Sequence, residues 1–277
     1  MIRACWGMVE SMASYRPLSE RAISRDLRTR TIGSRIVCLQ TVGSTNDWIA
    51  AAAREGAAEG LAVFAEEQTA GRGQAGHRWV APVGRCLLGS VLLRPPVPPS
   101  SLFLLTMLAA TAAAAATSEL SGLPIRLKWP NDLIGPRGKI GGILVETSIL
   151  GERVEYAVVG IGINVNLPRR MLTAIPGADS LQAAVGHRLN RNHLARALLR
   201  HLDARYSLLR GGRAAAIADE WRNRLGTLGR RVRLRRDGKE DIPLVAEGVT
   251  DDGALIVRAP DGSQLIIRAG EVSIQEE

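Results

Sequence analysis

The sequence has few cysteines and few aromatic side chains. Its three cysteines, Cys5, Cys38 and Cys86, are odd in number and widely spaced, which argues against a disulfide framework or a zinc site and favours a reducing compartment. None of the four histidines stands in an HExxH pattern. No aromatic residue interrupts the basic run at 222–236, so we interpret that run as a solvated face and expect no nucleic-acid partner. The net charge of +9 remains compatible with anionic substrates or acidic proteins.

The sequence also lacks targeting and membrane signals. The N-terminus has no apolar core of the length that a secretory signal requires. The apolar run at 102–116 is short, rich in alanine and interrupted by Thr106 and Thr111, which favours a buried helix. We therefore expect a cytoplasmic protein without membrane contact. Hydrophobic residues make up 46% of the 277 positions, enough for a core in one large or two modest domains.

The pattern of apolar and polar residues changes twice along the chain. Residues 1–34 carry many arginines and no periodicity, and we expect an irregular N-terminal extension. Residues 35–225 alternate apolar strand-like runs with helical segments. The strands are predicted at 35–40, 61–65, 86–93, 125–129, 140–146 and 154–165, and the helices at 45–54, 100–121, 192–209 and 213–225. Residues 226–277 alternate with period two and have turns at Asp237-Gly238, Asp251-Asp252-Gly253 and Asp261-Gly262, which predicts a small antiparallel β domain.

Two stretches carry polar residues where a ligand could bind. Ser44 precedes the helix at 45–54 as a good N-cap, and Asp47 follows in the capping-box position. Such a cap either only stabilises the helix or also presents hydroxyl and N–H groups to a polar ligand. The second stretch, EEQTAGRGQAGHRW at 66–79, places Arg72 among three glycines. Glycine lets backbone amides approach a ligand and the arginine fork suits two oxygens, so this loop is predicted to hold an anion; the alternative is a mobile surface hairpin with solvated arginines.

Three glycine motifs resemble nucleotide-binding fingerprints, and we reject each. Gly71-x-Gly73-x-x-Gly76 is followed by extended chain and not by the helix that a dinucleotide fold needs. Gly138-Lys139 lacks both the earlier glycine and the following Ser or Thr of a P-loop. Gly160-Ile161-Gly162 lacks the third glycine, and Pro168 interrupts the expected helix.

Five blocks in this order resemble biotin–protein ligases. They are GSTN at 43–46, Gln68 with GRG at 71–73 through Trp79, KWPND at 128–132, GKIGGILVE at 138–146 and GIGIN at 160–164. The resemblance covers residues 35–277. It implies an α+β fold with a mixed sheet and flanking helices, shared with lipoate ligases, and a small C-terminal SH3-like β-barrel. A lipoate or octanoate ligase of the same fold is the alternative.

The resemblance also implies a reaction and its partners. Biotin is attached to a lysine of a biotin carboxyl carrier protein through biotinyl-5′-AMP, and ATP is consumed as its Mg²⁺ complex. Catalytic roles are implied for Arg72, Lys139 and Asp132. Biotin contacts are implied for Ser44, Thr45, Asn46, Gln68, Arg72, Gly73, Gln74, Lys139 and Gly142, and nucleotide contacts for Arg72, Trp79, Lys128, Asn131, Asp132, Lys139 and Asn164.

Two features depart from the family pattern. Gln74 and His77 stand where the family commonly has arginine, which weakens a phosphate-binding role at those two positions. No DNA-binding domain precedes the ligase-like region, so we expect no repressor function. No metal site made of protein ligands alone is expected, and the enzyme is expected to be a monomer or a homodimer.

Overall fold

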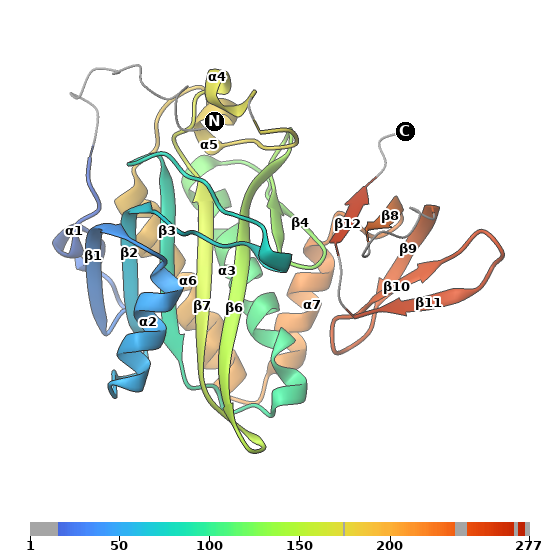
Figure 1. The fold of residues 1–277 in the computed structure, drawn as a ribbon, viewed down its shortest axis with the longest axis horizontal. Helices are drawn as coiled ribbons and strands as arrows, with labels where there is room; N and C mark the ends of the chain where they lie inside the picture. The colour runs from blue at the N-terminus through green and yellow to red at the C-terminus, as the bar shows by residue number, and fades with distance from the viewer. Residues whose placement is uncertain (1–15, 174, 236–242, 269–270, 275–277) are drawn as a thin grey trace.

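The computed structural model describes residues 16–173, 175–235, 243–268 and 271–274. Its larger part is built on a seven-stranded sheet with the order β1-β2-β3-β7-β6-β5-β4 (Figure 1). The strands are β1 (Arg35–Val42), β2 (Leu61–Gln68), β3 (Cys86–Leu93), β4 (Arg126–Lys128), β5 (Asp132–Ile134), β6 (Lys139–Leu150) and β7 (Arg153–Asn164). β1 and β2 run parallel and the remaining neighbours antiparallel, which confirms the predicted mixed sheet.

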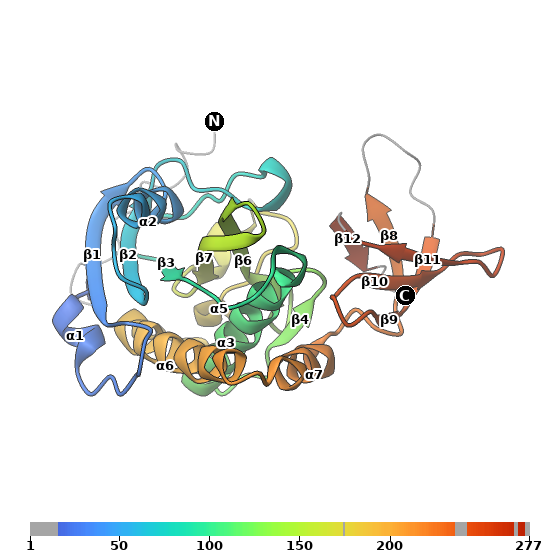
Figure 2. The same ribbon diagram turned by 90° about the horizontal axis from the view of Figure 1, so that it is seen from below.

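Helices cover both faces of this sheet. α2 packs on one face, whereas α3, α6 and α7 lie on the other (Figure 2). The helices are α1 (Glu20–Ser24), α2 (Thr45–Arg54), α3 (Phe103–Ser121), α4 (Arg169–Leu172), α5 (Leu181–Val185), α6 (Arg191–Arg210) and α7 (Ala214–Arg224), with short 3₁₀ turns η3 (Gln74–Gly76) and η4 (Pro99–Ser101). Because the two faces are both covered, β3 is buried along its whole length, which agrees with its mostly apolar sequence.

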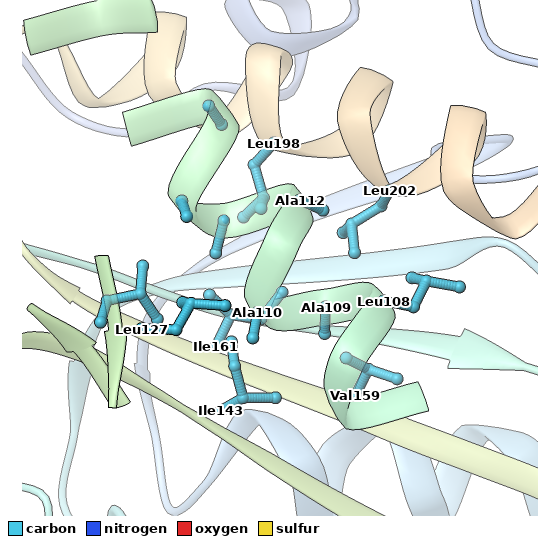
Figure 3. Close-up of a cluster of buried hydrophobic side chains, with 14 of the residues drawn as sticks. Leu108, Ala109, Ala110, Ala112, Leu127, Ile143, Val159, Ile161, Leu198 and Leu202 are labelled. Atoms are coloured by element: carbon cyan, nitrogen blue, oxygen red, sulfur yellow. The ribbon is translucent and has the colours of Figure 1, made fainter. Parts of the chain in front are cut away.

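The alanine-rich helix α3 lies at the centre of the core. It packs between the sheet, through residues such as Ile143 and Val159, and the leucines of α6 (Figure 3). Alanine side chains allow this close approach on both sides. The segment Pro99–Ser121 is long and apolar enough to cross a membrane by composition, but 61% of its most apolar window is buried inside the protein. The predicted buried helix is therefore confirmed.

The segment 16–34 differs from the irregular extension that we expected. It contains α1, and Leu18, Ile23 and Ile32 are buried in the main core. Asp203 on α6 accepts hydrogen bonds from the three consecutive backbone N–H groups of residues 30–32, each at 2.8 Å. The backbone N–H groups of this segment therefore bond to a carboxylate that lies far away in the sequence, which no local pattern could indicate. This packing joins it to the larger domain, and the limits at residues 35 and 226 stay predictions.

The C-terminal strands form a separate antiparallel sheet with the order β11-β10-β9-β8-β12. They are β8 (Arg231–Arg235), β9 (Pro243–Val249), β10 (Leu255–Arg258), β11 (Gln264–Ile267) and β12 (Glu271–Ile274). Two of the three predicted turns connect them, with Gly253 and Gly262 at φ of 85° and 86°. The third, Asp237-Gly238, lies outside the described residues. The small antiparallel domain is confirmed.

Trp129 connects the two domains. Its indole N–H donates to the backbone oxygen of Gly253 at 2.9 Å, and its backbone N–H donates to the Thr227 hydroxyl at 3.0 Å. The side chain is 1% exposed. The middle of the KWPND block is therefore anchored against the C-terminal domain. The side chains of Lys128 and Asp132, on either side of Trp129, approach each other to 3.5 Å.

Candidate active site

The glycine loop (residues 69–85) joins β2 to β3 and crosses in front of β7 and β6 (Figure 1). Arg72 and Arg78 pair as an antiparallel bridge, and the Gly73 N–H donates to the His77 oxygen at 2.6 Å. The tip is a single 3₁₀ turn, η3. The loop is thus a narrow hairpin and not the start of a helix, in agreement with our rejection of the dinucleotide fingerprint.

Beneath this loop the sheet presents a strip without side chains, which we call the glycine floor (Gly142, Gly160 and Gly162). A Cβ atom at Gly160 would lie 2.3 Å from Asn46 Oδ1, and one at Gly162 would lie 2.8 Å from the Trp79 ring. Gly142 on β6 pairs with Gly162 on β7. A Cβ atom at Gly160 or Gly162 would therefore collide with Asn46 or Trp79, and these two side chains can lie against the sheet only because both positions are glycine.

At one end of the glycine floor lies a buried group of hydrogen-bonding residues, the polar end (Thr45, Asn46, Gln68 and Ser90). The Ser90 hydroxyl lies 2.7 Å from Thr45 Oγ1 and 2.6 Å from Asn46 Oδ1. Gln68 Oε1 accepts from both the backbone N–H and the hydroxyl of Thr45, at 2.7 and 2.8 Å. Thr45, Asn46 and Ser90 are at most 4% exposed. The structure thus brings together three residues predicted to contact biotin and adds a fourth, Ser90.

The N-terminus of α2 is held differently from our expectation. Ser44 occupies the N-cap position, but its side chain makes no capping hydrogen bond. The free N–H of Thr45 is taken by Gln68 instead, and the Asp47 carboxylate faces Arg72. The predicted capping box is therefore wrong, because contacts with the next strand and the glycine loop replace the local ones.

At the other end of the glycine floor two lysines flank one carboxylate, and we call this group the charged end (Lys128, Asp132 and Lys139). Lys139 Nζ lies 2.5 Å from Asp132 Oδ1, and Lys128 Nζ lies 3.5 Å from Asp132 Oδ2. The carboxylate is only 11% exposed. A Cβ atom at Gly142 would lie 3.7 Å from Lys139 Nζ, so this group borders the floor. Two cations and one anion leave a net positive charge that suits an anionic ligand.

Backbone hydrogen bonds fix the position of Lys139. Its N–H donates to the Gly177 oxygen and its carbonyl accepts from the Asp179 N–H, both at 2.8 Å. The Asp179 carboxylate, which is 2% exposed, accepts from the Arg137 guanidinium at 3.3 Å. The turn that precedes Lys139 is therefore held by the residues just before α5.

Arg72 is bound by two carboxylates. Its Nη1 and Nη2 atoms lie 2.7 and 2.6 Å from the two oxygens of Asp47, and Nη2 lies 3.2 Å from Glu146 Oε1. The hydrogen bond from Arg72 holds the pKa of the Asp47 carboxyl below its usual value. Glu146 in turn accepts from Asn46 Nδ2 at 2.6 Å. The predicted anion-binding arginine is thus linked to the polar end.

Four predicted contact residues have other places in this structure. Asn131 donates to the Ile143 oxygen at 2.6 Å, and Asn164 donates to the Asp179 oxygen at 3.1 Å, so both amides brace the backbone. Gln74 is exposed at the tip of the loop. Trp79 covers Gly162, and its buried indole N–H has no hydrogen-bond partner among the described residues. The ligand contacts of these residues stay predictions.

Sequence reasoning missed three polar residues of the site, which are Asp47, Ser90 and Glu146. Ser90 is a single hydroxyl in an otherwise apolar buried strand, and such a residue needs a hydrogen-bond partner. Glu146 closes the GKIGGILVE block, where only its position in the motif could have drawn attention. Asp47 looked like a capping residue. Its role depends on a loop 25 residues away.

Metal coordination by protein side chains alone has no candidate among the described residues. No group of three or more His, Cys, Asp or Glu side chains in this part of the chain is placed to hold a metal ion. Magnesium is commonly held by one or two carboxylates together with substrate phosphates. An ion that arrives with a phosphate-containing substrate would therefore need no such group.

Hydrogen-bonding residues at one end of a glycine floor and a cationic group at the other fit a ligase that activates a carboxylate as its adenylate. Residues 40–164 match the biotin/lipoate A/B protein ligase family, and residues 227–274 match the biotin protein ligase C terminal domain. The biotin–[acetyl-CoA-carboxylase] ligase of Mycobacterium tuberculosis is 33% identical over 262 residues, which are 92% of this chain and 95% of that protein. The chain belongs to the biotin protein ligases of this family.

Two solved structures support this assignment. A biotin protein ligase from Aquifex aeolicus in complex with biotin and ATP matches with a TM-score of 0.72 and 25% identity, over 88% of this chain and 100% of that chain. The ligase from Leishmania major in complex with biotinyl-5-AMP matches with a TM-score of 0.58 and 26% identity, over 85% and 99% of the two chains.

Proposed function

We propose that this chain attaches biotin to a protein lysine in two steps. In the first, the biotin carboxylate attacks the α-phosphorus of MgATP, which forms biotinyl-5′-AMP and releases pyrophosphate. In the second, the amine of the acceptor lysine attacks the carbonyl carbon of the mixed anhydride, an amide bond forms and AMP leaves. The observation that carries this proposal is the placement of the polar end and the charged end at the two ends of one glycine floor.

The chemistry of the polar end favours biotin over lipoate. The ureido ring of biotin has one carbonyl acceptor and two N–H donors, which match the hydroxyls and amides of Thr45, Asn46, Gln68 and Ser90. The dithiolane ring of lipoate has neither an N–H donor nor a carbonyl acceptor to offer these groups, and a site built to hydrogen-bond a polar group discriminates against a ligand that lacks it.

The charged end fits the activation of a carboxylate. Two anions, the biotin carboxylate and the α-phosphate, must approach each other, and Lys139 and Lys128 offset their repulsion. Arg72 retains further N–H donors for the same purpose, because the guanidinium has five. We assign Asp132 the role of orienting or deprotonating the amine of the incoming acceptor lysine. Its carboxylate lies between Lys128 and Lys139 at the charged end.

The partner and setting follow from this reaction. We propose a biotin carboxyl carrier protein as the acceptor, because its lysine must reach the adenylate. We further propose that the protein acts in the cytoplasm, as a monomer or a homodimer, without a nucleic-acid or membrane partner. The scarcity of cysteine and the absence of aromatic residues from the basic run support this setting.

A thermal-shift experiment tests the function directly. Biotin with MgATP should raise the melting temperature by several degrees, because a ligand at about a thousand times its dissociation constant stabilises the folded state by about 4 kcal/mol. Lipoate with MgATP and duplex DNA are the controls and should leave it unchanged. A shift with lipoate equal to that with biotin would favour the alternative lipoate ligase.

The exposed Gln74 provides a prediction about retention of the intermediate. Gln74→Arg should slow the release of biotinyl-5′-AMP about tenfold, since a charge-assisted hydrogen bond to the phosphate is stronger than a neutral one by about 1.4 kcal/mol. The release rate is measured without carrier protein. Val83→Arg adds the same charge at an exposed position on the return of the loop and serves as the matched control. An unchanged rate in Gln74→Arg would show that position 74 does not face the phosphate.

A further inference from the structure

The tip of the glycine loop (residues 72–78) is connected to the body of the protein through Arg72. Within the loop, the Gly73 N–H bonds to the His77 oxygen and the Arg78 guanidinium bonds to the Thr69 oxygen. These bonds shape the hairpin but do not attach it to α2 or to β6. The Arg72 side chain makes that attachment, through Asp47 on α2 and Glu146 on β6.

The Arg72–Asp47 pair restrains both the distance and the orientation of the Arg72 guanidinium. Nη1 and Nη2 each meet one carboxylate oxygen, at 2.7 and 2.6 Å, which is the planar bidentate arrangement. A bidentate pair fixes the orientation of the guanidinium as well as its distance. The end of α2 that carries Asp47 is itself anchored, because the adjacent Asn46 is bonded to Ser90 and Glu146.

These contacts form one continuous path from the polar end to the loop. It runs from Ser90 through Asn46 and Glu146 to Arg72 and ends at Asp47. A ligand that occupies the polar end and the glycine floor lies beneath the same arginine that holds the loop. The stability of the Arg72 attachment therefore bears on how easily a bound adenylate escapes.

We propose that Asp47 is a positioning residue that holds Arg72, and through it the tip of the glycine loop, over the glycine floor, and thereby sets how long biotinyl-5′-AMP is retained. The retention part of this inference rests on the proposed function. The loop part does not, because the pair is formed between two of the protein's own side chains.

Glu146 does not replace Asp47 in this role. It lies farther from Arg72, at 3.2 and 3.4 Å, and both of these contacts are made to Nη2 alone. One of its oxygens also accepts from Asn46 at 2.6 Å. Without Asp47, Arg72 would keep one shared, longer contact and could rotate about it.

The first test measures the loop itself. Amide hydrogen exchange of residues 72–78 in the ligand-free protein should be about fivefold faster in Asp47→Ala, the size of effect that loss of one well-placed partly exposed ion pair allows. Asp47→Glu keeps the charge and should restore most of the protection. Asp219→Ala removes an exposed carboxylate that pairs with Arg222 at 2.7 Å on α7, and should leave the loop unchanged. Wild-type exchange in a folded Asp47→Ala protein would overturn the proposal.

The second test measures retention. Release of biotinyl-5′-AMP in the absence of carrier protein should be about fivefold faster in Asp47→Ala than in the wild type, with Asp47→Glu close to the wild type. Faster loop exchange together with unchanged release would overturn the retention role. Failure of the wild-type protein to form any adenylate would instead overturn the proposed function, and the exchange experiment would still decide the role of Asp47 in the loop.

Discussion

Adenylate formation should fall by a factor of about one hundred to one thousand when Lys139 is replaced by methionine, because a preorganised charge aimed at the developing negative charge is worth that much. Methionine keeps most of the side-chain volume, and the Lys139 side chain is 42% exposed, so the fold should survive. Pyrophosphate release from biotin and MgATP is the measurement. The loss should appear in the first step, while biotinyl-5′-AMP supplied from outside should still react with the carrier protein.

Lys139→Arg is the matched control, since it keeps the charge. We expect it to recover only part of the rate, because a planar guanidinium is bulkier than an ammonium and cannot take the same position 2.5 Å from Asp132. The small number of lysines in the sequence agrees with a specific need for ammonium groups at this site. The sequence has three lysines among its 36 basic residues, and two of them, Lys128 and Lys139, meet at Asp132. Near-normal pyrophosphate release in a folded Lys139→Met protein would remove Lys139 from the mechanism.

The regular elements were predictable where the local pattern and the tertiary environment agree. The bounds of β3 and α2 match the prediction, and α3 ends at Gly122 in the left-handed conformation, as a C-terminal glycine predicts. Gly151, which joins β6 to β7 with φ of 61°, shows the same local preference of glycine for a turn. In each case the signal is contained in a few neighbouring residues.

The missed features all depend on contacts between distant segments. The role of Asp47 requires that the glycine loop folds back onto α2, and the indole of Trp129 bonds to the carbonyl of Gly253, 124 residues later. α1 is a single short helix whose neighbours are held by Asp203, about 170 residues later. Motifs indicated which segments meet. They did not indicate which side chains of those segments touch.

A buried ion pair holds the two ends of the glycine loop, and it illustrates such a long-range contact. Glu66 stands just before the loop and Arg191 begins α6, with Nη1 of Arg191 2.7 Å from Glu66 Oε2 and both side chains at most 2% exposed. Arg191 also donates to the carbonyl of Cys86, just after the loop, at 3.2 Å. Glu66 further accepts from the Leu18 N–H at 2.6 Å. The pair therefore joins β2, β3, α6 and the N-terminal segment.

Arg191→Met should lower the free energy of unfolding by about 3–5 kcal/mol, because it leaves the Glu66 carboxylate buried without its charged partner. Urea unfolding of the ligand-free protein is the measurement. Replacing both partners, as Glu66→Leu with Arg191→Met, should cost clearly less than the sum of the two single changes, since the remaining unpaired charge is removed. The matched control is Arg200→Met, whose pair with Glu119 is equally short at 2.6 Å but 49% exposed on both sides and should contribute under about 1 kcal/mol. An Arg191→Met protein as stable as Arg200→Met would show that the buried pair contributes no more than the exposed one, and that the ends of the glycine loop are held by the surrounding apolar core instead.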